Sequence, residues 1–395
     1  MKALLKTFAS GQGDCIFLIL DNGERKYNLM VDCGQFNQPI KDFVAQTLSK
    51  HIDLLIVTHI DCDHVDGVTE MLKKIPDLTI GKIFYNCYQT VDGQSIMSMS
   101  EQVHSDIEML RSNLPSTVIA TDVGKVSMET ASVLSAQIMG NVVWNNVWTK
   151  EYIHNGTQDY PLGNNFGRLV FLAPTLDKIK ALDDDFAREY LRLTKHKLMD
   201  TPFPGQESLF ELVTKIVAMK KKERDMKRKQ KISIITDKYT DDRWNSAKNS
   251  ELEPVTSSNA ASIAFFWECN NKHVLFMGDA DPAIVTKSLQ DKKVTHIEFD
   301  AIKIAHHGSK HSTSNELMSI VDSNDYYFTG GNKTDKPSLE TLAKIVMRGD
   351  EKVRTIHYNN KRNLMMSDFE KPELCDIKSK YHFQITDNNE QEFEY

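Results

Sequence analysis

Short apolar runs separated by polar turns recur along this sequence, and the pattern predicts a mixed α/β protein. Asp21-Asn22-Gly23 is a strong signal for a β-hairpin turn, and Asn270-Asn271 is a second such signal. The expected strands are residues 15–20, 27–31, 53–57, 80–85, 262–268, 273–277, 301–305, 326–329, 355–358 and 382–386. Helical periodicity is found at residues 39–48, 67–74, 315–321 and 338–346, and another helix is expected to begin near Pro282.

Two stretches interrupt this pattern and are expected to be insertions in a single domain spanning residues 1–395. Residues 86–115 combine Ser, Met and Gln with a helical period, so we expect a helical cap there. Residues 176–250 predict a charged helical insertion. Its basic run, between residues 220 and 229, is expected to be a solvated helix face, and the alternative is a sequence-independent contact with nucleic-acid phosphates.

Composition narrows the classes of function. A formal charge of −7, from 48 Lys and Arg against 55 Asp and Glu, gives no overall positive field to attract nucleic acid. The sequence has no run of about 18 apolar residues, which argues against a membrane span. Its six cysteines form no CxxC pair, which argues against a disulfide framework or a zinc knuckle and favours a cytoplasmic location. The four tryptophans are expected to pack in the core or in a lid rather than to stack on bases.

Side chains that could hold a metal ion crowd together directly after the expected strand at residues 53–57. Within six residues lie His59, Asp61, Asp63 and His64. Carboxylates and imidazoles gathered at a strand end are costly to bury unless a cation compensates them. A bound divalent ion is the simplest explanation of this cluster.

Two later strands end in side chains of the same kinds. Asp279 and Asp281 follow one expected strand, and His306 and His307 follow the next. Strand ends in layered α/β folds converge on a common edge, where functional sites accumulate. The sequence therefore predicts that the three segments meet around two divalent ions, with Asp279 as a bridging carboxylate.

Several motifs taken together resemble the metallo-β-lactamase fold superfamily. They are His59-x-Asp61-x-Asp63-His64 with Gly67, Gly278-Asp279, and His306-His307-Gly308-Ser309. Within the superfamily, the chain is most similar to hydrolase domains related to the C-terminal domain of the DNA-uptake protein ComEC. This closer likeness rests on Gly11-Gln12-Gly13-Asp14, Asp32-Cys33-Gly34, Ser258-Asn259 with Ser262, and the His-His-Gly-Ser-Lys run.

The resemblance implies an α/β fold of a particular kind, an αββα metallo-β-lactamase sandwich with helical insertions and metal ions at one edge between the sheets. The implied ligands are His59 and Asp61 for the first ion, Asp63 and His64 for the second, Asp279 as the bridge, and His307 or His306 to complete the second site. We expect Asp14 and Asp32 to support these ligands from behind.

Two departures from the superfamily pattern affect the first metal site. Most members have histidine where Asp61 stands, and they carry a further histidine before the bridging aspartate. His154 is the closest candidate, although it precedes the strand end at residues 170–174 where that ligand is expected, and the alternative is a surface-loop histidine. An oxygen-rich site favours Mn²⁺ or Mg²⁺, with Zn²⁺ as the alternative.

The expected activity is hydrolysis of a phosphodiester, as by a nuclease acting on DNA or RNA. Metal ions would lower the pKa of a bound water, and Asp63 would position that water. His306 or His311 would neutralise a phosphate oxygen or protonate the leaving group. The same loop supplies further donors, Ser309, Lys310 and Ser312. Charged donors favour an anionic phosphate over an uncharged lactam.

Two other functions stay open at this point. One is hydrolysis of a small ester, such as a cyclic nucleotide, phosphocholine or a lactone, with the insertions forming a lid. The other is a non-catalytic partner subunit whose metal site is structural. The expected partner is a nucleic acid or nucleotide substrate, with no membrane contact, and the sequence identifies no protein partner.

Overall fold

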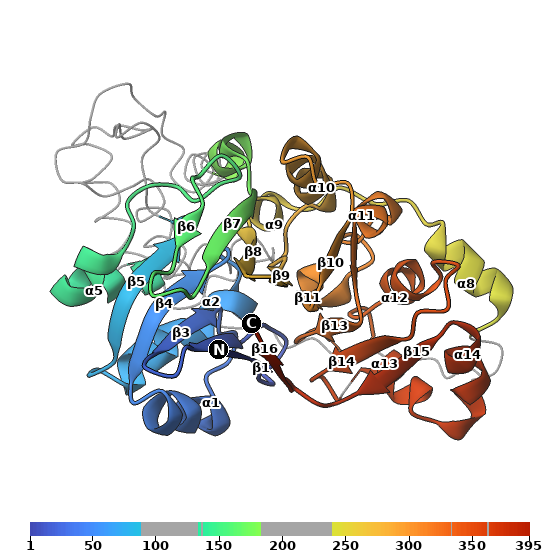
Figure 1. Ribbon diagram of the computed structural model, residues 1–395, viewed down its shortest axis with the longest axis horizontal. Helices are drawn as coiled ribbons and strands as arrows, with labels where there is room; N and C mark the ends of the chain where they lie inside the picture. The colour runs from blue at the N-terminus through green and yellow to red at the C-terminus, as the bar shows by residue number, and fades with distance from the viewer. Residues whose placement is uncertain (88–132, 136, 183–238, 333, 362) are drawn as a thin grey trace, which may run out of the picture.

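Two large β-sheets with helices packed around them organise the described part of the chain (Figure 1). The computed structural model describes residues 1–395 except 88–132, 136, 183–238, 333 and 362. Nearly all of the expected cap at residues 86–115, and the basic run between residues 220 and 229, lie outside the described residues. The fold is mixed α/β, as the sequence pattern predicts.

The first sheet has six strands in the order β16-β1-β2-β3-β4-β5. Neighbours are antiparallel from β16 to β3 and parallel from β3 to β5. The strands are β1 (Lys2–Thr7), β2 (Ile16–Asp21), β3 (Lys26–Val31), β4 (His51–Val57), β5 (Thr79–Tyr85) and β16 (Glu390–Glu394). The sequence pattern did not predict β1 or β16. The charged sequence of β16 becomes a strand because it pairs with β1 along the sheet edge.

The second sheet has eight strands in the order β15-β14-β13-β11-β9-β8-β7-β6. Neighbours are parallel from β15 to β9 and antiparallel from β9 to β6. The strands are β6 (Tyr160–Pro161), β7 (Arg168–Ala173), β8 (Ala264–Cys269), β9 (Lys272–Phe276), β11 (Ala301–Lys303), β13 (Asp325–Phe328), β14 (Arg354–Tyr358) and β15 (Phe383–Thr386). A separate parallel pair joins β10 (Ile297–Phe299) to β12 (Val321–Ser323).

The helices are mostly short. They are α1 (Gln38–Asp42), α2 (Cys62–Lys74), α5 (Val142–Val147), α8 (Asp241–Lys248), α9 (Ser257–Ala260), α10 (Pro282–Asp291), α11 (Asn315–Ile320), α12 (Leu339–Val346), α13 (Leu364–Phe369) and α14 (Cys375–Lys380). A π turn, Phe43–Thr47, continues α1, and 3-10 turns are found at Ala305–Gly308 and Pro372–Leu374. No helix in the described ranges is long and apolar enough to cross a membrane.

One apolar cluster joins the two large sheets. It contains Leu18 and Leu54 from the first sheet and Phe171, Phe265 and Phe276 from the second. All five side chains are buried. Because successive side chains of a strand point to opposite faces, the neighbouring residues of these strands pack elsewhere. The two sheets therefore share a hydrophobic core on their facing sides.

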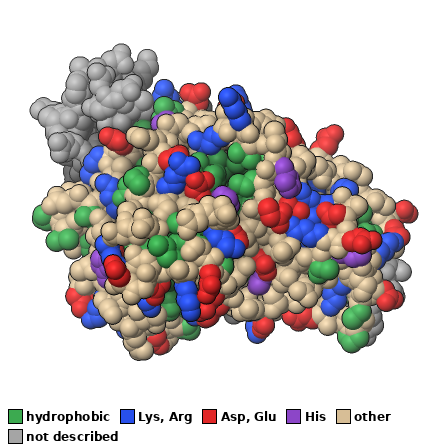
Figure 2. Space-filling model, in the orientation of Figure 1, with side chains coloured by type: hydrophobic (Ala, Val, Ile, Leu, Met, Phe, Trp, Pro, Cys, Tyr) green, Lys and Arg blue, Asp and Glu red, His purple; other side chains and the backbone are tan. Residues whose placement is uncertain are grey.

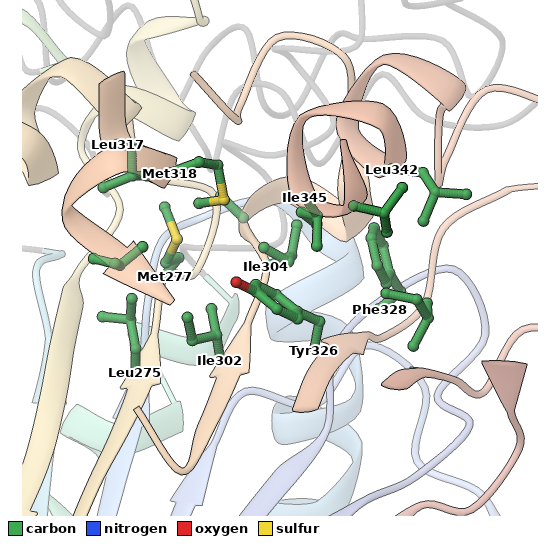
Figure 3. Close-up of a cluster of buried hydrophobic side chains, with 14 of the residues drawn as sticks. Leu275, Met277, Ile302, Ile304, Leu317, Met318, Tyr326, Phe328, Leu342 and Ile345 are labelled. Carbon is green, nitrogen blue, oxygen red and sulfur yellow. The ribbon is translucent and has the colours of Figure 1, made fainter. Parts of the chain in front are cut away.

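The other face of each sheet packs against helices. Leu55, next to Leu54 on β4, belongs to a cluster that includes Val65 of α2. In the second sheet, Leu275 on β9 belongs to a cluster that includes Leu317 of α11 (Figure 3). Each large sheet is thus buried on both faces, which explains why the strands in the middle of the sheets read as continuous apolar runs.

The tryptophans lie in the core, as the sequence predicts, and charged side chains of both signs are found on the surface. The four tryptophans are all buried: Trp144, Trp148, Trp244 and Trp267. None of them is therefore exposed for stacking on a base. Acidic and basic side chains are interspersed over the face shown in Figure 2, as expected from a nearly balanced charge composition.

A buried charged network fixes β12 beside the second sheet. Arg354 is fully buried and donates to Asp322 twice, from Nε at 3.1 Å and from Nη2 at 2.9 Å. Arg348 and the hydroxyl of Tyr326 donate to the same carboxylate. Burial alone would raise the pKa of Asp322, but these donors outweigh it and hold the pKa well below its usual range.

We expect Asp322→Ala to lower the free energy of unfolding by about 3 kcal/mol at pH 7. The buried Arg354 would keep its ion pair with Asp350 but lose both hydrogen bonds to Asp322, and Arg348 would lose its hydrogen bond to the same carboxylate. The pKa of Asp322 is lower in the folded state than in the unfolded state. Its stabilisation is therefore complete above the ordinary carboxyl pKa of 3.8 and is lost as the pH falls below that value. Urea denaturation of both proteins at pH 7 and pH 3 should show a smaller difference at pH 3.

The matched control is Asp77→Ala. Asp77 forms an ion pair with Lys50 at 2.5 Å, and both side chains are exposed. Exposed pairs contribute little to stability, so this change should leave the denaturation midpoint unaltered. Equal losses of stability in the two variants would contradict the role assigned to the buried network.

Candidate metal centre

Strands of both sheets end at one edge, where the candidate ligands gather. β2 and β3 pair Ile16 with Val31, so Asp14, before β2, lies beside Asp32, after β3. His59 follows β4, which is parallel to β3 and next to it. In the second sheet, the parallel neighbours β9 and β11 end in loops that carry the other candidate ligands. Antiparallel and parallel pairing together thus bring distant segments to one place.

Helix α2 and a glycine-containing loop hold the first ligands in position. The helix begins at Cys62 rather than near the expected residue 67, so Asp63 and His64 lie in its first turn, where the helix dipole favours a carboxylate. Asp14 donates its backbone N–H to the carbonyl oxygen of Asp63 at 3.2 Å. A Cβ at Gly13 would lie 1.5 Å from that same oxygen, so only glycine fits.

His306 and His307 lie in a tight turn rather than at the end of a strand. β11 ends at Lys303, and the two histidines have positive φ angles of 51° and 54°. Residues other than glycine rarely adopt this backbone conformation. Because of the turn, both Nε2 atoms come within 3.9 Å of Oδ2 of Asp279, instead of pointing in opposite directions.

Asp279 lies at the middle of the cluster. Its Oδ1 is 3.3 Å from Nε2 of His64, and its Oδ2 is 3.7 Å from Nε2 of His59. These three buried residues each offer a ligand atom within 4.8 Å of the others, and Asp14, His64 and His307 form a second group of this kind. Both groups could hold a metal ion. A carboxylate whose two oxygens face different histidines suits a bridging position.

Asp63 and the two neighbouring histidines complete the arrangement. Nε2 of His307 is 3.1 Å from Oδ2 of Asp63 and 3.9 Å from Oδ2 of Asp279. Nε2 of His306 lies 3.5 Å from the same Asp279 oxygen. His307 therefore approaches two of the implied ligands, Asp63 and Asp279. His306 approaches Asp279 but not Asp63.

Buried ligand atoms of the cluster lack partners. Nε2 of His59, Nε2 of His64 and Oδ1 of Asp279 make no well-aligned hydrogen bond within the described part of the chain, although the last two atoms lie 3.3 Å apart. Each buried polar atom left unpaired costs about 1–3 kcal/mol. Oδ2 of Asp61 adds a carboxylate oxygen 3.7 Å from Nε2 of His59. Because a divalent cation between these atoms would satisfy them together, the donor set fits a metal ion.

Two buried carboxylates orient imidazole rings from behind. Asp32 accepts hydrogen bonds from the backbone N–H and the hydroxyl of Thr58, both at 2.7 Å, and its Oδ2 lies 2.8 Å from Nδ1 of His64. Asp14 Oδ1 lies 3.1 Å from Nδ1 of His307. A carboxylate on Nδ1 fixes the ring and leaves Nε2 available to a metal. Asp14 and Asp32 thus contact histidines of the cluster, and their supporting role stays a prediction.

The sequence pattern did not identify Lys303, which is fully buried beside the centre. Its Nζ contacts the Asp14 carboxylate, donates to the carbonyl oxygen of Gly278 at 3.0 Å and lies 4.0 Å from Oδ1 of Asp279. Burial alone would lower the pKa of Lys303, but the two carboxylates outweigh it and raise the pKa. Lys303 therefore remains charged and balances part of the negative charge. A lysine inside an apolar strand before a His-His pair is the signal that could have revealed it.

The carboxylates draw positive charge into the cluster. Burial would lower the pKa of His64 and of His307, but the adjacent carboxylates raise it well above the usual value for His64 and to about 9 for His307. Burial would raise the pKa of Asp279, but the surrounding histidines hold it well below its usual range. The same field that attracts protons attracts a cation, which replaces them when it binds.

His306 has different surroundings. Burial lowers the pKa of His306 to about 3, and the Lys336 ammonium group adds to this effect while Asp279 opposes it. Lys336 donates from Nζ to Nε2 of His306. On the other ring nitrogen, the Asn259 amide and the Ser312 hydroxyl each lie 3.3 Å from Nδ1. His306 is therefore a neutral imidazole with polar partners on both nitrogens. The sequence pattern gave Lys336 and Asn259 no role at this site.

Two residues considered from the sequence lie away from the centre. Asp281 caps α10 by accepting from the backbone N–H of Ala283 at 2.9 Å. His154 accepts from the backbone N–H of Gly156 in its own loop. Neither belongs to the two metal-capable groups found among the described residues. The surface-loop alternative therefore describes His154 better than the ligand alternative.

The loop after His307 has both exposed and buried side chains. Lys310 and His311 both face Glu253, with separations of 3.6 Å and 3.7 Å. Ser309 is buried, and its hydroxyl accepts from the backbone N–H of His311 at 3.4 Å. Ser312 is buried against the His306 ring, as described above. The proposed contacts of this loop with a substrate stay predictions.

A scan against models of known protein families finds no family that matches this chain, and a search of curated proteins finds no matching protein. Any proposal of function therefore depends on the residues and geometry of the centre.

Proposed function

We propose that the protein is a metal-dependent hydrolase of phosphodiesters, and in particular a nuclease acting on DNA or RNA. The proposal is carried by the unpaired, buried ligand atoms of His59, His64 and Asp279, which fit a divalent cation. His306 and Lys336 lie next to these atoms and can donate to an anion. A cation site beside such donors suits a phosphate ester.

The proposal includes an αββα sandwich as the finer architecture. It is supported by the alternation of Leu54 and Leu55, which belong to the cluster between the sheets and to the cluster under α2, respectively. Leu275 and Phe276 divide in the same way between the helix-covered and shared faces of the second sheet. In such a sandwich, the ends of strands from both sheets are available to build one site.

Two divalent ions, Zn²⁺ or Mn²⁺ with Mg²⁺ as an alternative, are the proposed cofactors. The residues that would hold them are His59 and Asp61 for the first ion, Asp63, His64 and His307 for the second, and Asp279 between the two. When bound, divalent ions lower the pKa of a coordinated water and stabilise charge on a phosphoryl oxygen. The oxygen-rich first site favours Mn²⁺ or Mg²⁺.

The chain's own residues would orient the reacting groups. The partly exposed Asp63 would accept a hydrogen bond from the attacking water and fix its direction. Neutral His306 and charged Lys336 would donate to a phosphate oxygen, where negative charge develops. His311 would give a proton to the leaving group, because a neutral His306 imidazole can donate a hydrogen bond but has no acidic proton to transfer. Asp14 and Asp32 would keep His307 and His64 correctly oriented.

A small ester is the second candidate substrate. The cavities next to the centre have volumes of 880 and 1190 Å³, one within and one above the range of about 300–1,000 Å³ for small-molecule sites. The two candidates differ in how binding responds to salt. Affinity for a polynucleotide should fall steeply between 50 and about 200 mM salt, whereas affinity for an uncharged lactone should stay nearly constant.

Metal binding is the first test. We expect Asp279→Asn to weaken binding of Mn²⁺ or Zn²⁺ by at least about 100-fold, because even groups that only orient ligands contribute about 10–100-fold. Isothermal titration calorimetry and elemental analysis of the purified protein measure this effect. Asp281→Asn is the matched control, because Asp281 lies two residues away and caps α10 instead. Equal metal affinity in the two variants would refute the assignment of Asp279.

Hydrolysis of bis-p-nitrophenyl phosphate is the second test. We expect activity that EDTA removes and added Mn²⁺ or Zn²⁺ restores, and we expect Asp63→Asn to lower kcat by about 100-fold or more through loss of water orientation. Asp77→Asn is the control and should keep full activity, because Asp77 belongs to an exposed ion pair and to neither metal-capable group. Bound metal without hydrolysis of any phosphodiester would favour the non-catalytic alternative.

A further inference from the structure

Two cavities reach the candidate centre from different elements. One, here called the basic cavity, has a volume of 880 Å³ and includes His306, Lys310 and Lys336 in its lining. The other, here called the amide cavity, has a volume of 1190 Å³ and includes Asp63 in its lining. Asn332 lines both cavities. The two spaces therefore border one shared residue, and each reaches the centre through one candidate ligand, His306 or Asp63.

The exposure of the candidate ligands agrees with access from these two sides. The side chains of Asp279 and His307 are at most 2% exposed, whereas that of His306 is 17% exposed and that of Asp63 is 29% exposed. His306 and Asp63 line one cavity each, whereas Asp61, which is 20% exposed, lines neither. A phosphodiester held at the centre would therefore direct one ester substituent into each cavity.

Positive charge is concentrated in the basic cavity. Among the basic residues of this lining, Lys336 contacts a candidate ligand directly, because its Nζ donates to the His306 ring. Arg243 and Lys310 line the same space, and Lys310 is only weakly engaged, at 3.6 Å from the exposed Glu253. Asp335 and Glu340 are the acidic residues of this lining. Arg243, Lys310 and Lys336 outnumber these two acidic residues, so the lining can bind an anion.

The amide cavity has the opposite character. Uncharged amides dominate its side-chain lining: Gln12, Gln35, Asn37, Asn332, Asn359, Asn360 and Asn389. Its only basic lining residue among those described is Lys361, which is held by Asp387 at 2.7 Å. Asp66 adds negative charge, and Glu70 is paired with Lys74 at 2.6 Å. This lining suits an uncharged, hydrogen-bonding group such as a sugar or a base, and it disfavours a second phosphate.

We propose that the substrate is an asymmetric phosphodiester, with a second phosphate on the substituent that enters the basic cavity and an uncharged nucleoside on the substituent that enters the amide cavity. This inference rests on the proposed phosphodiesterase function and specifies its substrate class. The end of a polynucleotide chain has this chemistry, because a terminal nucleoside carries no phosphate beyond the one that links it to the chain. The enzyme would therefore act from one chain end.

The reaction leaves the second phosphate unchanged. The oxygen of a water molecule forms a bond to phosphorus, and the ester bond from phosphorus to the leaving oxygen breaks. One water proton is transferred to the leaving oxygen, so the products are a phosphomonoester and an alcohol. The phosphate in the basic cavity serves only to bind and orient the substrate.

Three dinucleotides of thymidine test the proposal with the metal-loaded, full-length protein. The first has one phosphodiester and no other phosphate, the second carries an added 5′-phosphate, and the third carries an added 3′-phosphate. We expect one of the two phosphorylated compounds, and not the other, to show a kcat/KM about tenfold or more above that of the first, because charge-assisted hydrogen bonds are strong. The corresponding uridine compounds distinguish DNA from RNA substrates.

Variants locate the effect in the basic cavity. Lys336→Met and Arg243→Met should each reduce the gain from the added phosphate, and the remaining gain should fall as salt is raised. Lys336→Arg, which keeps the charge, should retain more of the gain than Lys336→Met. The control is Lys287→Met, which makes the same chemical change at an exposed position of α10 outside both cavities and should keep the full gain.

The outcomes separate this inference from the function on which it rests. Hydrolysis of the first compound with equal kcat/KM for all three would overturn the asymmetric substrate and leave the phosphodiesterase function standing. Equal gains from the 5′- and 3′-phosphates, or a gain unchanged in Lys336→Met and Arg243→Met, would also overturn it. Failure to hydrolyse any of the compounds or bis-p-nitrophenyl phosphate, with any metal, would overturn the proposed function itself.

Discussion

The burial of several carboxylates at the ends of strands is the constraint on which the rest of this structure depends. Asp14, Asp32 and Asp279 are almost completely removed from solvent, and burial of an ionised carboxylate is expensive unless it is paired. Lys303 and the donors of Thr58 offset part of this cost. The remaining charge has to be balanced by protons on histidine or by a cation, which is why the site and the fold cannot be considered separately.

The same groups couple the two large sheets. Asp14, which precedes a strand of the first sheet, contacts Lys303 and His307 of the second. In return, Asp279 of the second sheet faces His64, which belongs to the helix after β4 of the first. Neither sheet carries a complete set of ligands. A cation bound between them would favour the assembled state over the unfolded chain, so cation affinity and sheet packing would be thermodynamically linked.

The sequence was sufficient to predict which segments meet at the site, because several apolar strands are each followed directly by carboxylates or imidazoles. Details set by tertiary contacts were not. β16 has a charged sequence and becomes a strand only beside β1, and Lys303 is hidden in a strand of three residues. The early start of α2 could have been inferred, since Asp61 at its N-cap and Asp63 in its first turn are ordinary helix-start signals that were interpreted only as ligands.

The left-handed backbone of His306 and His307 has a consequence for how the protein can be engineered. Each residue in this conformation costs of order 1–3 kcal/mol, and the contacts around it must offset that cost. Glycine would relieve that strain at either position, but at His307 it would also leave the buried Asp14 carboxylate without its imidazole partner. The two adjacent histidines therefore differ in what the fold can lose, and a selection for thermal resistance would act against His306 more readily than against His307.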